Sequence, residues 1–164
     1  MFKTTRVATL LIIAAIFITS CSTSKEARKY RSGIDGNWQL MTVTTEGIKG
    51  TVKAELLGEA SINCFVGSTW KFNKNNSLGT YSINQNGGEC AAVTRNIRWS
   101  IYEAPGEPKL FQFKKLDNNY KEVEEGSAGY RFSILQLDDN TLKIQNDVTY
   151  SGQPIAFIYT FSKN

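Results

Sequence analysis

The stretch that decides the fold is YRFSILQLDDNTLKIQNDVTYSGQPIAFIYTFS, residues 130–162. It contains three β-like runs rich in apolar and aromatic residues, over residues 130–137, 141–150 and 155–162. Asp138-Asp139-Asn140 separates the first two runs and Ser151-Gly152-Gln153-Pro154 the last two, and these residue types favour turns. The stretch therefore predicts three consecutive strands joined by short turns.

Five more strand-like runs precede this stretch, over residues 37–45, 68–73, 78–84, 95–102 and 109–116. The most regular is 95–102, where Ile97, Trp99 and Ile101 share one face, as expected of a half-buried strand. The sequence Lys74-Asn75-Asn76-Ser77 predicts a hairpin turn between the second and third runs. Residues 52–60 are compatible with one short helix.

Eight strands with mostly short connections limit the architecture. An antiparallel sheet with one apolar face must pack on a second sheet or close on itself, and closure removes both edges. We therefore predict an all-β fold, an eight-stranded antiparallel up-and-down β-barrel with at most one short helix. A barrel of this size is either filled by side chains or holds one small ligand.

The N-terminal residues have the pattern of a signal peptide. Lys3 and Arg6 precede an uncharged apolar run, Val7 to Ile18. A membrane-spanning helix needs roughly 20 apolar residues, so this run is too short to favour one. The run ends in Ile18-Thr19-Ser20-Cys21, which resembles the lipobox of bacterial lipoproteins.

The lipobox resemblance implies a lipid anchor. In such lipoproteins the chain is cut before the cysteine, so residues 1–20 would be removed and Cys21 would carry three acyl chains. Several acyl chains make a permanent membrane anchor. Residues 21–32 would then be the lipidated Cys21 and a polar tether, and residues 33–164 the barrel domain. No aspartate follows Cys21, which by the rule for such lipoproteins favours the outer membrane over the inner one. No acidic tract follows either, which favours the periplasmic face.

Charge and cysteine content narrow the possible partners. Without residues 1–20 the chain has 17 basic and 15 acidic residues, which gives a net charge of +2. No run of basic residues lies on an expected strand, so we expect no nucleic-acid partner.

Cys64 and Cys90 are the two cysteines that remain once Cys21 is assigned to the lipid anchor. An even pair in an exported chain favours a disulfide between them. Two unpaired thiols or a metal site are the alternatives, although the chain contains no histidine.

The sequence contains few of the residue patterns that catalytic sites require. The absence of histidine excludes the usual Ser-His and Cys-His nucleophile systems, and no glycine-rich phosphate loop is present. The acidic residues of 122–125 and of 138–139 fall in expected loops, with no known calcium-loop spacing. We therefore predict no enzyme activity, no cofactor and no metal.

Gly36-Asn37-Trp38, at the start of the first predicted strand, resembles the first signature of the lipocalins, in which the tryptophan closes one end of an eight-stranded barrel. The wider pattern is similar to bacterial lipocalin-like lipoproteins: a lipobox, then Cys64, Thr69-Trp70-Lys71-Phe72-Asn73, Cys90, Trp99, Ile134-Leu135-Gln136-Leu137 and Leu142-Lys143-Ile144. Two features depart from the lipocalins. The Thr-Asp-Tyr signature is missing, and no arginine follows the last strand to stack on Trp38.

The resemblance also implies where the cysteine pair lies. In a chain of this kind, Cys64 and Cys90 would tie the start of the second strand to the end of the third. Such positions meet in a hairpin, which supports the disulfide.

The best candidate site is the apolar inner face of the sheet. We predict as ligand-binding residues Trp70, Phe72, Trp99, Phe111, Phe113, Phe132, Phe157 and Tyr159. Aromatic walls suit a small apolar ligand, but the same residues can also form a solid core. The resulting hypothesis is a lipid-anchored envelope lipoprotein that binds or carries a small hydrophobic ligand. The alternative is a non-catalytic envelope protein with a filled barrel that acts through contacts with an unidentified protein.

Overall fold

The computed structural model describes residues 23–164 apart from 51, 124–125 and 127–128. The predicted signal peptide and Cys21 lie outside the described residues. The elements are α2 (Lys25–Ile34), β1 (Gly36–Glu46), β2 (Glu55–Leu56), β3 (Ala60–Ser61), α3 (Ile62–Phe65), β4 (Thr69–Asn73), β5 (Leu78–Ile83), β6 (Val93–Tyr102), β7 (Leu110–Leu116), β8 (Tyr130–Leu137), β9 (Thr141–Tyr150) and β10 (Gln153–Lys163).

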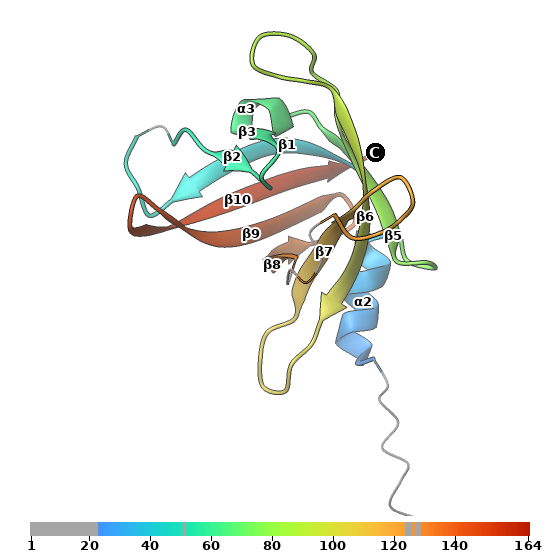
Figure 1. The fold of residues 1–164 in the computed structure, drawn as a ribbon. Coiled ribbons are helices and arrows are strands. Elements are labelled where there is room, and N and C mark those ends of the chain that lie inside the picture. Colours follow the sequence, from blue (N-terminus) through green and yellow to red (C-terminus); the bar gives the residue numbers. More distant parts are fainter. Residues whose placement is uncertain (1–22, 51, 124–125, 127–128) are drawn as a thin grey trace, which may run out of the picture.

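Eight of these strands form a closed antiparallel barrel in the order β1-β10-β9-β8-β7-β6-β5-β4. Strands that follow one another in this set pair with one another, as the predicted up-and-down connections require, and the first two pair where Gly36–Gln39 of β1 face Thr69–Phe72 of β4. The barrel closes where the last strand, β10, returns to pair with β1. The predicted eight-stranded barrel is therefore confirmed (Figure 1).

Helix α2 replaces the polar tether that the sequence analysis expects. The Ser24 hydroxyl accepts a hydrogen bond from the Ala27 backbone N–H at 3.0 Å, which caps the helix start. Ala27 and Ile34 lie on the barrel-facing side and are fully buried. Two apolar residues seven positions apart mark one helical face, a signal too sparse to stand out in a segment that is otherwise polar.

The short helix expected over residues 52–60 is wrong. Residues 55–61 instead form a small hairpin, β2 and β3, whose turn holds Leu57 and Gly58 at positive φ angles of 56° and 59°. The Glu59 N–H donates to the Leu56 carbonyl at 3.0 Å and closes this turn. Two successive residues at positive φ suit a tight hairpin turn, although leucine rarely adopts a positive φ. The described residues thus contain two helices, α2 and the four-residue α3, rather than at most one.

The two ends of the barrel are covered by different parts of the chain. Helix α2 covers the end where β1 starts, which we call the closed end. The segment from β2 to α3 covers the end where β1 finishes, which we call the mouth (Figure 1). The predicted Cys64–Cys90 disulfide is confirmed, with the two Cα atoms 5.4 Å apart. It joins α3 to the β5–β6 loop rather than two strand ends, so it fastens the mouth segment to the barrel wall.

Trp38 seals the closed end without the arginine of the lipocalins. Its ring is fully buried and its indole N–H donates to the Ile34 carbonyl at 2.8 Å. The Lys163 ammonium lies 5.0 Å from the centre of the ring, within the range of a cation–π contact. The tryptophan therefore closes this end of the barrel, as the lipocalin resemblance implies, with lysine in place of arginine as the cation over the ring.

Candidate functional site

Strands β8 and β9 separate as they approach the mouth. They pair only where Ser133–Leu137 face Leu142–Gln145, with an irregularity between Ile134 and Gln136. Beyond that, β9 continues along β10 to Tyr150 and the start of β8 pairs with β7, so the two strands share no ladder near the mouth. A bulge increases local twist and bends its strand, which accounts for the divergence. The Asn146 side-chain amide bridges the gap by donating to the Arg131 carbonyl at 3.1 Å.

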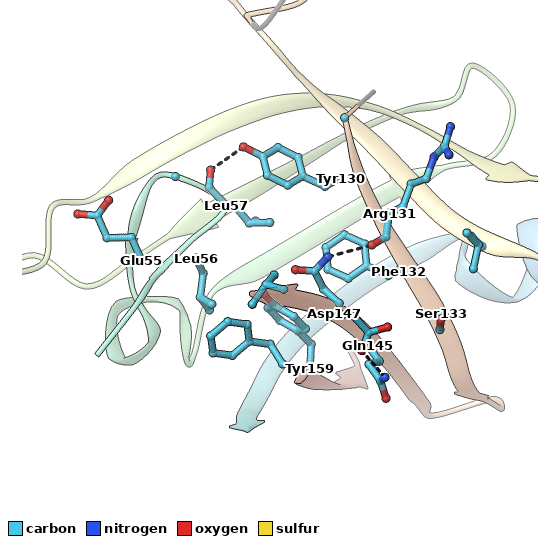
Figure 2. A pocket seen from close by; sticks show the side chains of 16 residues that line it. Glu55, Leu56, Leu57, Tyr130, Arg131, Phe132, Ser133, Gln145, Asp147 and Tyr159 are labelled. Carbon is cyan, nitrogen blue, oxygen red and sulfur yellow. Dashed lines mark hydrogen bonds between the residues drawn. The ribbon is translucent and has the colours of Figure 1, made fainter. Parts of the chain in front are cut away.

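A pocket of about 560 Å³ opens at this gap (Figure 2). The lining residues come mainly from β8, β9, β10 and the β2–β3 hairpin, with one from β7 and one from the loop before β8. They are Glu55, Leu56, Leu57, Gly58, Leu110, Gly129, Tyr130, Arg131, Phe132, Ser133, Gln145, Asn146, Asp147, Val148, Phe157 and Tyr159. Leu56, Leu57, Phe132, Phe157 and Tyr159 are buried, whereas the charged rim residues Glu55, Arg131 and Asp147 are exposed. The pocket therefore combines an apolar interior with a polar rim, as small-molecule sites do.

The turn of the β2–β3 hairpin forms the roof of the pocket. The Leu57 carbonyl accepts hydrogen bonds from the Tyr130 hydroxyl at 2.8 Å and from the Lys115 ammonium at 3.0 Å. Lys115 is buried, and its ammonium also lies 5.4 Å from the centre of the Tyr130 ring. Leu56 and Leu57 are thereby held over the barrel interior.

A second set of contacts ties the same hairpin to β5 and β6. Both Glu59 carboxylate oxygens accept from Arg95, the shortest N–O distance being 2.7 Å, and Oε2 also accepts from the Tyr81 hydroxyl at 3.1 Å. The Arg95 guanidinium holds the pKa of Glu59 below its ordinary value. Burial, with the Glu59 charge second, raises the pKa of Tyr81. We call this Glu59–Arg95–Tyr81 cluster the latch.

The charged groups on the pocket rim are mainly acidic. Asp147 accepts from the Gln145 side-chain amide at 2.7 Å, and Glu55 is exposed beside the hairpin. Figure 2 shows the Arg131 side chain directed away from Phe132 and Tyr159. Its Nε donates to the Gln112 side chain at 3.1 Å and its guanidinium lies 4.1 Å from the centre of the Tyr102 ring, on the outer side of the barrel.

The structure divides the eight predicted ligand-binding residues into two groups. All eight are buried, but only Phe132, Phe157 and Tyr159 line the pocket between β8 and β9. The other five pack into a continuous aromatic cluster, with ring centres 5.4 Å apart for Phe72 and Phe111 and 5.8 Å apart for Trp70 and Phe113. Trp70 also stacks on Tyr81 at 4.7 Å. This half of the barrel interior is filled.

The sequence analysis missed the roof and rim of the pocket. Leu56 and Leu57 were assigned to an expected helix, although their neighbour Gly58 signals a tight turn. Asn146 and Asp147 follow the alternating part of their strand and carry no pattern that marks a site. The gap between β8 and β9 depends on strand register, which no local pattern reveals.

A second hollow, of about 720 Å³, lies between β1 and the segment before α3. Its walls include Val43, Val52, Lys53 and Glu89, and half of its lining residues are exposed. Val52 alone among these described lining residues is buried, so this hollow lacks the buried aromatic floor of the pocket between β8 and β9.

The acidic residues weighed as a calcium site in the sequence analysis have other contacts. Asp138 accepts from the backbone of Asn140 and Thr141 and from the Gln136 side chain, which holds its pKa below the ordinary value and fixes the β8–β9 turn. Glu122 pairs with Lys114 at 2.7 Å. Glu124 and Glu125 lie outside the described residues. In the part of the chain that the structure describes, no three His, Cys, Asp or Glu residues are grouped so as to hold a metal ion.

None of the helices within the described ranges has the length and apolar character needed to cross a membrane.

Several solved structures are similar to this chain at low sequence identity. This chain is similar to bovine odorant binding protein in complex with a selenium-containing odorant, at 12% identity and a TM-score of 0.42, over 87% of this chain and 78% of that one. It is similar to apocrustacyanin C2, at 15% identity and a TM-score of 0.46, and to lobster apocrustacyanin A1, at 16% and 0.43, each over 85% of this chain and 65% of that one.

No curated protein sequence matches the chain significantly. A family model described as a lipocalin-like domain matches residues 34–144, which is more than half of the chain. The matched range runs from the end of α2 through β8 to Ile144 in β9, and so includes the β8 wall of the gap. The chain belongs to the lipocalin-like domain family.

Proposed function

We propose that this protein binds or carries a small hydrophobic molecule in the pocket between β8 and β9, as a lipid-anchored lipoprotein of the cell envelope. The observation that carries the binding proposal is a pocket with a buried aromatic floor in a chain of a family whose members typically bind small hydrophobic ligands. The proposal includes no catalytic step.

The filled half of the barrel supports placing the ligand in the pocket between β8 and β9. Trp70, Phe72 and Phe111 occupy the interior behind β4 to β7, so a ligand seated along the barrel axis would have to displace them. Cores packed at protein density do not open without loss of stability. The ligand therefore contacts Phe132, Phe157 and Tyr159, and the remaining aromatic residues support these three.

The anchoring part of the proposal rests on the lipobox and on the position of Cys21 in the sequence. Cys21 lies two residues before Thr23, a span of at most about 7 Å in an extended chain. Ser24 is fixed to the barrel because its N–H donates to the Glu103 carboxylate at 3.3 Å. An acylated Cys21 would hold the closed end near the lipid surface, and the outer membrane, periplasmic side, is the location we propose.

The binding experiment uses residues 22–164, which contain the whole barrel and α2. Uptake of N-phenyl-1-naphthylamine, an uncharged fluorescent probe, and native mass spectrometry of the protein purified without added ligand test the pocket. We expect saturable uptake, and about tenfold weaker uptake in Val148→Phe, which fills the pocket. Val93→Phe is the matched control, because Val93 is a half-buried valine on β6 away from the pocket. Equal uptake by the two variants would contradict binding at this site.

A second candidate function is contact with another protein. Tyr120 and Val123 in the β7–β8 loop are 52% and 54% exposed, which is high for apolar side chains. Native protein with no added mass and no probe uptake would favour this function over ligand carriage. Loss of a defined cross-linked complex in Tyr120→Ser/Val123→Ser would then support it.

A further inference from the structure

The Tyr159 hydroxyl is a buried polar group without a hydrogen-bond partner among the described residues. The side chain is only 2% exposed, and its ring packs edge-on against Phe132 at 5.5 Å between ring centres. Every side-chain nitrogen and oxygen that is fully sealed within the described residues has a partner. The Tyr159 hydroxyl therefore reaches the free space of the pocket that Tyr159 lines.

An unpartnered hydroxyl in such a place is costly unless something binds it. A hydroxyl that is removed from water without a replacement hydrogen bond destabilises the state that contains it. Its neighbours on the same strand, Ile158 and Thr160, face the other way because side chains alternate along a strand. Burial raises the pKa of Tyr159, so the group stays a neutral phenol that donates or accepts one hydrogen bond.

The charges around the pocket disfavour an anionic ligand. Asp147 and Glu55 lie on the rim, and the Arg131 guanidinium is held on the outer side by Gln112 and Tyr102.

Lys115 is the cation nearest to the roof, and it is already engaged. Its ammonium donates to the Leu57 carbonyl at 3.0 Å, and its charge also acts on Glu59 of the latch. Binding a carboxylate there would require breaking the contact that holds the roof. Such an anion would lose its hydration without gaining a partner.

We infer that the pocket selects an uncharged amphiphile, with an apolar body against Phe132, Phe157 and Leu57 and one hydroxyl or carbonyl group on the Tyr159 hydroxyl. The corresponding carboxylate is rejected. This inference rests on the proposed function, because it names the class of molecule that the same pocket takes.

The test compares three ligands with the same ten-carbon chain in displacement of N-phenyl-1-naphthylamine at pH 7.5. The ligands are 1-decanol, decanoate and 1-chlorodecane, and the last has no hydroxyl or carboxylate. We expect 1-decanol to bind at least tenfold more tightly than decanoate. Tyr159→Phe removes only the hydroxyl, so it should weaken 1-decanol about fivefold and leave 1-chlorodecane unchanged.

The matched control is Tyr30→Phe, which removes the hydroxyl of a half-buried tyrosine on α2. It should leave all three affinities unchanged. Thermal unfolding of each variant confirms that the barrel is intact. If the probe does not bind at all, the proposed function fails. If the probe binds but decanoate competes as well as 1-decanol, or Tyr159→Phe leaves 1-decanol unaffected, the inference is overturned while the binding function stands.

Discussion

The two ends of this barrel are sealed by different kinds of contact. At the closed end, α2 covers Trp38 through buried apolar side chains such as Ile34, and the Lys163 ammonium stacks on the indole ring. At the mouth, the β2–β3 hairpin depends on hydrogen bonds and an ion pair from Glu59 and on a disulfide.

The closed end is therefore sealed permanently, whereas the seal at the mouth can be released. Apolar packing is lost only when the surrounding core is lost, because no single group in it titrates or is reduced. The mouth contacts respond to pH through Glu59 and to redox conditions through Cys64 and Cys90. The roof of the pocket therefore belongs to the end of the molecule that can loosen while the barrel stays folded.

The largest effect is expected from breaking the closed end with Trp38→Ala. Removing a fully buried tryptophan costs its transfer free energy and leaves a cavity, so the free energy of unfolding should fall by about 3–5 kcal/mol. Urea denaturation followed by tryptophan fluorescence and circular dichroism measures it. Met41→Ala is the control, since Met41 on the same strand is 49% exposed and its loss should cost less than about 0.5 kcal/mol. A similar cost for the two variants would contradict the closed-end seal.

Removing the disulfide should loosen the mouth. Cys64 and Cys90 are 26 residues apart, so Cys64→Ala/Cys90→Ala should lower the free energy of unfolding by about 3.5 kcal/mol on the chain-entropy account. Amide hydrogen exchange should also quicken in the β2–β3 hairpin while the backbone of Trp38 and Leu40 stays protected. Equal acceleration at both ends would show that the mouth does not loosen separately.

The barrel follows from the sequence because alternation and turns are local signals. The runs from residue 130 to 162 predict β8, β9 and β10 within a few residues, and the turn at Asp138 is fixed by that residue's own side chain. Helix α2 was missed because its burial comes from contacts with distant strands, as when Arg31 lies 5.2 Å from the Trp99 ring centre. The many basic residues of this segment are typical of a solvent-exposed linker, so the sequence gives no sign of that contact.

The site was predicted only in part for a similar reason. Alternation shows that Phe132, Phe157 and Tyr159 face inward, but it also points Trp70 and Phe72 inward and cannot distinguish a lining residue from a packed one. An inward-facing residue lines the pocket only near the place where β8 and β9 stop pairing, and that place depends on the register of the two strands. Leu57 was misplaced because its positive φ is imposed by hydrogen bonds from Tyr130 and Lys115, which lie far away in the sequence.

Glu59→Gln tests how far the seal at the mouth depends on charge, because it removes the negative charge of the latch. Arg95 lowers the pKa of Glu59 in the folded chain, so the ionised carboxylate favours folding. This contribution is present above the ordinary pKa of 4.5 and is lost as pH falls through the lowered value. Because Arg95 is partly exposed, we expect a cost of about 1 kcal/mol at pH 7 that is smaller at pH 3.

Urea denaturation of the wild type and the variant at both pH values measures this cost. Glu46→Gln, at the end of β1, replaces an exposed carboxylate and serves as the control. A cost that persists unchanged at pH 3 would show that the latch acts by packing and not by charge.

The smallest effect is expected from Lys163→Met, which removes only the cation at the closed end. The ammonium lies over Trp38 and donates to the Gly33 carbonyl at 3.3 Å, whereas methionine keeps most of the apolar stem. A cation–π contact of this kind contributes about 0.5–1 kcal/mol, so the free energy of unfolding should fall by that amount. Lys163→Arg should retain it, and Lys143→Met on β9 is the control. A loss as large as that of Trp38→Ala would mean that the closed end, like the mouth, depends on a polar contact, and the contrast between the two ends would fail.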